Sequence, residues 1–516
     1  MNSDRPPTPR FLGVALAFGV VFAVVLIRTA WVSDDAYITF RSIDNWLGGY
    51  GLRWNPIERV QAYTHPLWML SVSAAVAISG EFFYTSIALG IVFSLAALGL
   101  LCTSVAFSAT SAALALTALL FSRAFVDYST SGLENALSHL LFAVFAAQWA
   151  KRGQVSGLVA LGLTAGLAAT NRLDAALLYA PPLLALAYRG AVPRAAGWLA
   201  LGFAPLLAWE IFSIVYYGFA FPNTAYAKLA TGVPRSELIV QGLRYLLHAV
   251  RTDPITPGVI AAGVALALTR RGPGDIAVAS GIALQLAYGV AIGGDFMAGR
   301  FLSLPVFAAA VLLARGPLPL SARAGVAATA TVATLGLLVP NAPPLTGADY
   351  GADRDAQERD HGISDERRWY YPWSGMLRAS DPGPDPENRW VRLGRQLRRD
   401  GTPVARFGVV GFLGYFAGPR VHIVDHFGLA DPLLARLPAK REGWRIGHFR
   451  RRLPPGYIES VGTDANRIGD PATAALRDDL VLITRGPIFT GSRWRAIGRV
   501  NLGRYDRPGH VDSEDR

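Results

Sequence analysis

Runs of apolar residues alternate with short polar connections along the first 340 residues of the chain. The first run, Phe11 to Trp31, has about the 20 residues that a bilayer-spanning helix needs. It is longer than the apolar core of a signal peptide and lacks a small-residue cleavage site, so we expect an uncleaved anchor. Further apolar helices are expected at residues 66–80, 84–107, 109–126, 134–150, 155–170, 173–189, 196–217, 256–270, 275–293, 300–314 and 323–340.

Arginine and lysine gather in alternate connections between these runs. The cation-rich connections are residues 151–154, 189–194, 270–275 and 315–323, together with the N-terminus. By the positive-inside rule they face the cytoplasm, which puts the long connections at 32–65, 127–135 and 218–255 outside. This alternation leaves no crossing for residues 66–80. It predicts eleven transmembrane helices, a cytoplasmic N-terminus and an extracytoplasmic C-terminus.

The composition changes near residue 341, where Pro, Gly, Arg and Asp replace the apolar runs. We expect a transmembrane domain over 1–340, a linker over 341–366 and a soluble α/β domain over 367–516. Three short apolar runs bounded by Gly and Pro are read as buried strands: residues 403–411, 420–425 and 480–484. The predicted fold class is therefore an all-α polytopic membrane protein with a C-terminal soluble α/β domain.

The composition supports the prediction of a membrane protein and gives no reason to expect a nucleic acid partner. Of the 516 residues 52% are hydrophobic and 17% charged, with a mean hydropathy of +0.31. The net charge is +12, but 46 of the 49 cations are arginine, so genomic codon preference is a sufficient explanation and no nucleic acid partner is expected. The single cysteine, Cys102, excludes an intramolecular disulfide and a multi-cysteine metal site.

Two adjacent carboxylates, Asp34 and Asp35, follow the first apolar run on its predicted outer side. Such a pair can accept a proton from a sugar hydroxyl or hold a divalent cation. Mutual repulsion and a partly apolar interface would raise one pKa, which suits a general base. A solvated pair at the start of a loop is the alternative.

The loop that begins with these carboxylates has a distinctive order of residues. DDAYITFR starts at Asp34, and NPIERVQAYTHP runs from Asn55 to Pro66. Polar motifs also stand at the other predicted outer connections: Ser131 to Glu134, Asn171 to Asp174, Pro222 to Thr224 with Tyr226 and Lys228, and Gly293 to Asp295 with Arg300 and Phe301.

Together these motifs resemble the GT-C glycosyltransferases and, within them, the bacterial terminal arabinofuranosyltransferase family. The resemblance covers nearly the whole chain, including the run from Val409 to Pro438. Two positions depart from the family pattern: Phe296 follows Gly-Gly-Asp where Trp or Tyr is usual, and His65 stands in the run after Tyr63. These departures bear on the acceptor rather than on the class of reaction.

The resemblance implies transfer of arabinofuranose from decaprenyl-phosphate-arabinose to arabinan ends in the cell wall, at the plasma membrane. Asp34 or Asp35 would be the catalytic base, and the other would orient the donor or hold a divalent cation; no cofactor is certain. Residues implied in binding the donor phosphate or substrate are Tyr37, Arg41, His65, Glu134, Arg172, Asn223, Lys228, Asp295 and Arg300. Ion pairs that hold the loops, a helix N-cap for Glu134 and snorkelling of Lys228 are the structural alternatives.

Other functions remain open at this stage. A related enzyme could use another polyprenyl-phosphate sugar and a different acceptor. A transporter or flippase would show paired repeats and polar groups at mid-membrane depth, and the sequence has no internal repeat and concentrates its polar motifs in loops. A non-catalytic envelope protein on the same scaffold would tolerate substitution of Asp34 and Asp35.

Overall fold

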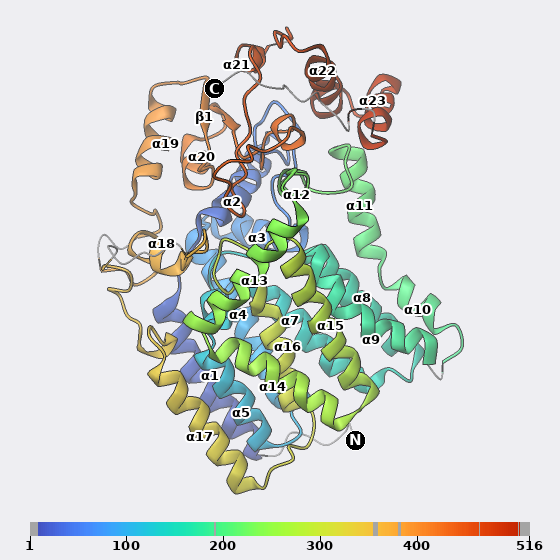
Figure 1. The fold of residues 1–516 in the computed structure, drawn as a ribbon, viewed down its shortest axis with the longest axis vertical. Helices are drawn as coiled ribbons and strands as arrows, with labels where there is room; N and C mark the ends of the chain where they lie inside the picture. Colours follow the sequence, from blue (N-terminus) through green and yellow to red (C-terminus); the bar gives the residue numbers. More distant parts are fainter. Residues whose placement is uncertain are drawn as a thin grey trace. The chain divides into compact units, whose positions relative to one another are not determined.

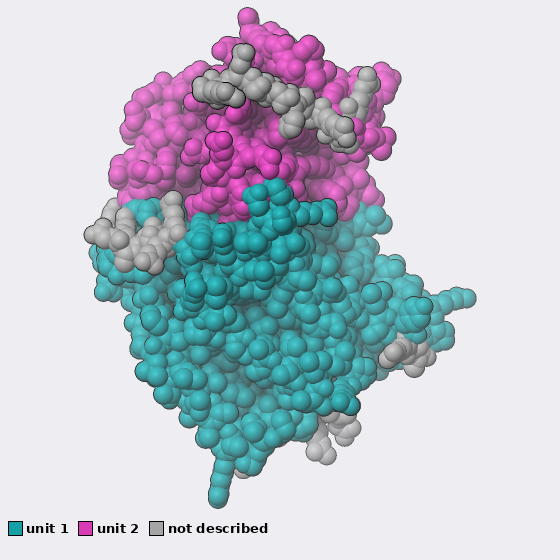
Figure 2. All heavy atoms as spheres, in the orientation of Figure 1, with its two compact units in different colours: residues 1–33, 65–207, 234–386 teal, residues 34–64, 208–233, 387–516 magenta. Residues whose placement is uncertain are grey.

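The computed structural model describes residues 9–189, 192–353, 360–379, 383–463, 465–503 and 505. The chain forms two compact units, coloured separately in Figure 2, and each is built from three segments of sequence. Unit 1 comprises 1–33, 65–207 and 234–386, and unit 2 comprises 34–64, 208–233 and 387–516. Six of the predicted linker residues, 354–359, and the tail from 506 lie outside the described residues. The domain limits predicted from composition stay a prediction.

Unit 1 is helical wherever the structure shows regular elements of more than three residues. Its helices are α1 (Pro9–Thr29), α3 (Pro66–Ser79), α4 (Phe83–Leu100) with a π-helical turn (Leu101–Val105), α5 (Ala109–Phe121), α6 (Arg123–Asp127), α7 (Asn135–Gln148), α8 (Val155–Asn171), α9 (Ala176–Arg189), α10 (Ala195–Leu201), α13 (Arg235–Thr252), α14 (Ile255–Arg270), α15 (Pro273–Ala291), α16 (Ser303–Ala314), α17 (Ala322–Leu338) and α18 (Glu366–Ser374). Helix α11 (Ala204–Tyr216) continues from unit 1 into unit 2. Every apolar run predicted from the sequence is helical for most of its length.

In the part of the chain that the structure describes, three helices are long and apolar enough to cross a membrane: Phe11–Thr29, Phe83–Val105 and Pro273–Ala291. The number rises to five if two bent pairs, α10 with α11 and α13 with α14, each count as one span. Six further apolar helices of 10–17 residues are shorter than this limit. The chain is thus a membrane protein, and the eleven crossings and their orientation stay predictions.

Helix α16 is the centre of unit 1. All twelve of its residues are buried, and it packs against α5, α7 and α14 (Figure 1). A helix that is apolar on every side has no solvent face, so it folds where neighbours surround it. Helix α5 in turn packs on α1 and α17.

Helix α13 lies within a connection for which the sequence predicted no helix. Its buried face carries Tyr245 and His248, whereas Leu243 and Leu247 are about half exposed on the opposite side. It meets α14 at an angle of 105°. Because its apolar and polar faces are separated around the helix, α13 has the pattern of a helix lying along an interface rather than of a bilayer span.

Unit 2 joins helices to one pair of parallel strands. Its elements are α2 (Asp34–Leu47), α12 (Asn223–Leu229), α19 (Arg389–Arg399), β1 (Val404–Phe407), α20 (Phe412–Ala417), β2 (His422–Asp425), α21 (Tyr457–Ser460), α22 (Pro471–Arg485) and α23 (Gly491–Asn501). Strand β1 pairs with β2 so that Val404 faces His422 and Phe407 faces Asp425. The strands predicted at 403–411 and 420–425 are confirmed over residues 404–407 and 422–425.

The third predicted strand, residues 480–484, is wrong. These residues form the last turns of α22, a 15-residue helix whose N-cap Asp470 accepts the backbone N–H of Thr473 and whose first residue is Pro471. Five apolar residues alone fit a buried strand or a buried helix, and the length of the element and its cap decide between them. The class of the C-terminal region as a whole stays a prediction.

Candidate active site

Asp34 begins α2 and is held by two backbone amides of unit 2. Its carboxylate accepts the N–H of Phe412 at 2.7 Å and of Gly411 at 3.2 Å, at the start of α20. A Cβ on Gly411 would lie 1.9 Å from the Asp34 carbonyl oxygen, so only glycine allows this approach. Burial raises the pKa of Asp34 to about 7, although the two amides act in the opposite direction.

Asp35 differs from Asp34 in exposure. It is partly exposed, whereas Asp34 is 8% exposed. Both Asp34 oxygens already accept amides, which makes Asp34 a poor metal ligand in this conformation. Across the described residues no group of three or more His, Cys, Asp or Glu could hold a metal ion. A divalent cation at this pair therefore stays a prediction that a chelator can test.

The first-loop residues Arg41 and Tyr37 are packed inside unit 2. Arg41 is 2% exposed and donates to the carbonyl oxygens of Trp54 and Val421, at 2.8 and 2.9 Å, and to that of Gly414. Its guanidinium also lies 4.2 Å from the centre of the Trp54 ring. Tyr37 stacks among the aromatic rings of α2 and α20. This geometry favours a loop-holding role for Arg41 over phosphate binding.

Asn223, like Arg41, is buried and makes hydrogen bonds that hold unit 2 together, whereas Lys228 is partly exposed. The Asn223 amide donates to the carbonyl oxygens of Gly428 and Asp431, at 2.8 and 3.0 Å, and accepts from Arg436 at 3.0 Å. It thereby ties α12 to the segment after β2. Lys228 is partly exposed in the last turn of α12, a position open to either a binding or a snorkelling role.

Five other predicted residues, Glu134 and four that surround it, lie together in unit 1. Glu134 is fully buried and directly precedes α7. One Glu134 oxygen accepts Arg172 at 2.7 Å and Arg300 at 3.2 Å, and the other lies 3.1 Å from His65 Nδ1. Arg300 also pairs with Asp295 at 3.5 Å. We call these five residues the Glu134 cluster. Four loop motifs far apart in the sequence thus converge on one buried carboxylate.

The cluster keeps its central carboxylate ionised. Burial alone would raise the pKa of Glu134, but Arg300, His65 and Arg172 together hold it well below its usual range. Arg172 also makes a bidentate pair with Asp174, with both contacts at 2.8 Å. Its side chain is 16% exposed, against 8% for Arg300 and 6% for His65. Arg172 is therefore the cation of the cluster best placed to meet a ligand.

Sequence reasoning missed the partner of Asp34. Gly411 lies 377 residues further along the chain, at the end of the run 403–411 for which the sequence predicts a buried strand. Nothing in a single sequence links two such distant positions. The one indication in the sequence is that residue 411 is a glycine, because a close approach of another backbone segment requires glycine.

Comparison with known proteins supports a membrane glycosyltransferase. The chain is 28% identical, over 86% of its own length and 84% of the relative's, to a terminal β-(1→2)-arabinofuranosyltransferase of Mycobacterium tuberculosis. A protein of the same name from Corynebacterium glutamicum is also 28% identical, over 81% of this chain and 72% of that one. The resemblance noted in the loop motifs is thereby confirmed. No family model matches the chain.

One solved structure shows a distant likeness. ArnT from Cupriavidus metallidurans, crystallised with undecaprenyl phosphate, matches with a TM-score of 0.43 and 16% identity, over 83% of this chain and 76% of that one. A likeness this distant carries no functional weight.

Proposed function

We propose that the chain is a GT-C glycosyltransferase that transfers arabinofuranose from decaprenyl-phosphate-arabinose to the ends of arabinan. The observation that carries the proposal is the similarity to two terminal arabinofuranosyltransferases over more than four fifths of the chain. That similarity is too extensive to come from apolar helices in one unit alone. The enzyme would work at the outer face of the plasma membrane, with the N-terminus in the cytoplasm.

Asp35 is the proposed general base. The acceptor hydroxyl gives its proton to the Asp35 carboxylate while its oxygen bonds to the anomeric carbon of the donor sugar. The bond from that carbon to the phosphate oxygen breaks, and the electron pair leaves with the polyprenyl phosphate. Asp34, whose oxygens are held by backbone amides, is a positioning residue that fixes the start of α2.

Arg172 is the proposed partner of the leaving phosphate, because guanidinium groups stabilise developing phosphate charge. Glu134, which also pairs with Arg300 and His65, holds Arg172 in place. The polyprenyl chain stays in the bilayer, because each buried CH₂ contributes about 0.8 kcal/mol. Only the phosphosugar head has to reach these residues.

The direct test uses purified full-length protein, radiolabelled decaprenyl-phosphate-arabinose and a synthetic arabinan acceptor. We expect Asp35→Asn to lower kcat by at least about 100-fold, the range of general-base catalysis. The matched control is Asp44→Asn, since Asp44 is exposed on the same helix, and it should keep wild-type activity. Full activity in Asp35→Asn would contradict the mechanism.

Two further arms of the same assay separate the alternatives. A chelator tests for a cation: unchanged activity excludes a dependence on an accessible divalent ion. If the folded wild type is inactive with the arabinose donor, other polyprenyl-phosphate sugars replace it, and transfer from one of them would keep the class and change the substrate.

A further inference from the structure

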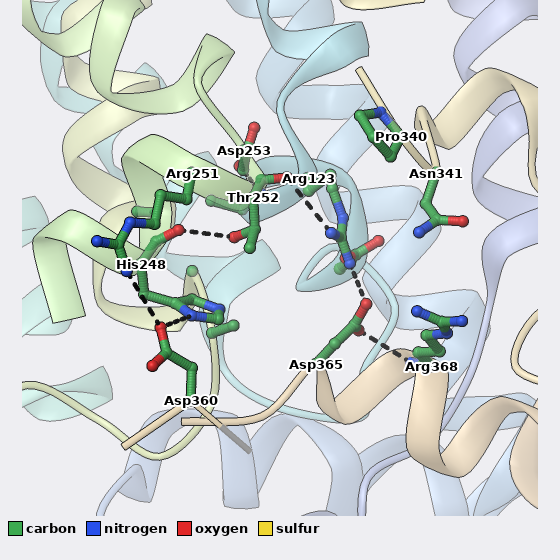
Figure 3. Close-up of a pocket in the computed structure, with 15 residues that line it drawn as sticks. Arg123, His248, Arg251, Thr252, Asp253, Pro340, Asn341, Asp360, Asp365 and Arg368 are labelled. Atoms are coloured by element: carbon green, nitrogen blue, oxygen red, sulfur yellow. Dashed lines mark hydrogen bonds and ion pairs between the residues drawn. The ribbon is translucent and has the colours of Figure 1, made fainter. Parts of the chain in front are cut away.

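A large cavity in unit 1, lined for the most part by charged and polar residues, belongs to none of the sequence motifs described above. It has a volume of about 780 Å³, within the range of ligand sites. It lies where α13 ends, α6 and α18 begin, and the chain leaves α17 (Figure 3). Helix α5 ends just before α6, and α14 begins just after α13. The cavity thus sits where several apolar helices terminate, at the end of the bundle rather than within it.

Its charged side chains are arranged in facing pairs. Arg123 points at Asp365 and also donates to Tyr350, and His248 Nδ1 lies 3.3 Å from Asp360 (Figure 3). Arg251 stands 4.0 Å from the same Asp360 carboxylate and its side chain is 62% exposed. The lining therefore offers donors and acceptors side by side.

The charged residues that line the cavity indicate which class of ligand it can bind. Three arginines and one histidine line the cavity against four aspartates. A phosphate would meet four carboxylates and only three guanidiniums, and carboxylates repel it. Hydroxyl groups suit such a lining, because each can donate to a carboxylate and accept from a guanidinium.

Among the described residues, none that lines the cavity offers a wall for a lipid chain. Its apolar side chains are those of three alanines and one proline, too small to bury a polyprenyl tail. The ligand that fits this lining is a neutral, hydroxyl-rich molecule.

One wall of the cavity leads directly to the Glu134 cluster. Ala298 and Gly299 line the cavity and immediately precede Arg300. Gly299 has φ +81°, and a Cβ there would lie 3.2 Å from Ala124, so the segment is closely fitted. A ligand in the cavity would touch the segment that carries Arg300.

We propose that this cavity binds a neutral oligosaccharide and serves as a subsite for the acceptor chain. The proposal rests on the transfer reaction proposed above, since it names where part of the acceptor lies. It adds residues from α6, α13 and α18 that no loop motif indicated.

The first test fills the cavity without removing a charge. Ala298 lines the cavity, and its hydrogen bonds to Ser364 and Tyr128 are made by its backbone, so Ala298→Leu adds volume at the cavity wall and keeps these bonds. Ala327→Leu is the matched control, on an exposed position of α17. We expect Ala298→Leu to weaken binding of a synthetic arabinofuranosyl hexasaccharide to the full-length protein by at least about tenfold, measured by calorimetry. Unchanged affinity in a folded variant would overturn the proposal.

The second test decides between a neutral and an anionic ligand. In Asp360→Asn one carboxylate acceptor is lost, so affinity for the hexasaccharide should fall by about three- to tenfold. Farnesyl phosphate, a soluble monophosphate, is the comparison probe and should bind neither protein at this cavity. If Asp360→Asn instead binds farnesyl phosphate more tightly and the hexasaccharide unchanged, the cavity is an anion site and the proposal fails.

Kinetics separate this proposal from the proposed function. With wild-type transfer established, Ala298→Leu should raise the acceptor KM by about tenfold and leave kcat within about twofold. Transfer with an unchanged acceptor KM would reject the cavity and keep the enzyme. Binding of the hexasaccharide that Ala298→Leu weakens, without any arabinose transfer by the wild type, would reject the proposed donor and keep the cavity as a sugar site.

Discussion

At the scale of single residues, adjacent carboxylates of the first loop have separate environments. Asp34 is buried and anchored by two amides, while Asp35 is partly exposed. The proposed mechanism therefore assigns positioning to Asp34 and proton transfer to Asp35, the more accessible of the two carboxylates. A double substitution would not reveal this division, whereas single substitutions will.

The raised pKa of Asp34 predicts a pH-dependent stability. The pKa of Asp34 is about 7 in the folded protein, against 3.8 in the unfolded chain, so the contribution of Asp34 to stability is fully present below pH 3.8 and is lost as the pH rises through 7. Asp34→Asn cannot ionise and should lose less thermal stability than wild type between about pH 5 and about pH 7.5. The raised pKa values of Asp425 and Asp431 are common to both proteins and cancel in the difference. Equal pH profiles would show that Asp34 does not titrate in this range.

Gly411 should be the least replaceable residue of the Asp34 site. Gly411→Ala puts a Cβ 1.9 Å from a backbone oxygen, and backbone cannot move aside as a flexible side chain can. We expect a destabilisation of at least about 1–3 kcal/mol, seen as a lower unfolding temperature. Gly469→Ala is the control, because nothing lies within 4 Å of its added Cβ, and its unfolding temperature should stay near that of wild type.

Glu134 should be equally sensitive for an electrostatic reason. Glu134→Gln leaves Arg172 and Arg300 buried without the charge that they share, and breaking a buried pair in this way costs about 3–5 kcal/mol. The unfolding midpoint should fall accordingly, and transfer activity should fall with it. Glu459→Gln, on an exposed position of α21, serves as the control. A stable Glu134→Gln protein would show that the arginines find other partners.

At the scale of elements, the hydrophobic pattern predicts helices well and misjudges short or mixed segments. The apolar runs of the first 340 residues are so long that their length predicts helices without a test of their periodicity, and all of them form helices. Residues 480–484 are too few to distinguish a strand from a helix, and α13 was missed because its apolar residues share the helix with arginines. Element type follows from sequence where the run is long and uniform.

The sequence likewise predicts one part of the candidate site and misses another. The residues of the Glu134 cluster were predicted from motifs at the ends of helices, because parallel or antiparallel packing brings such ends together. The cavity residues Arg123, His248 and Asp365 come from segments without a motif, and their proximity depends on tertiary packing. A single sequence contains no signal for that proximity.

At the scale of the whole molecule, the predicted orientation has a direct test. Cys102 is 1% exposed, so an introduced cysteine can report its own location with little background. Ala322→Cys lies in a connection predicted to be cytoplasmic, and Ser492→Cys lies in the predicted outer region; both positions are exposed. In intact cells a membrane-impermeant maleimide should label Ser492→Cys and should label Ala322→Cys only after permeabilisation. The reverse pattern would invert the topology.

Unit 2 is assembled from three separate segments of the chain, and this has a consequence for biosynthesis. The amides that hold Asp34 lie 377 residues downstream, which at about 5–20 residues per second means a delay of roughly 20 to 75 seconds between their syntheses. During that interval the first loop has left the ribosome without its final partners. In the proposed mechanism the newly made enzyme therefore stays inactive until its last segment has emerged, and a truncated product that stops near residue 386 would lack the amides that hold Asp34.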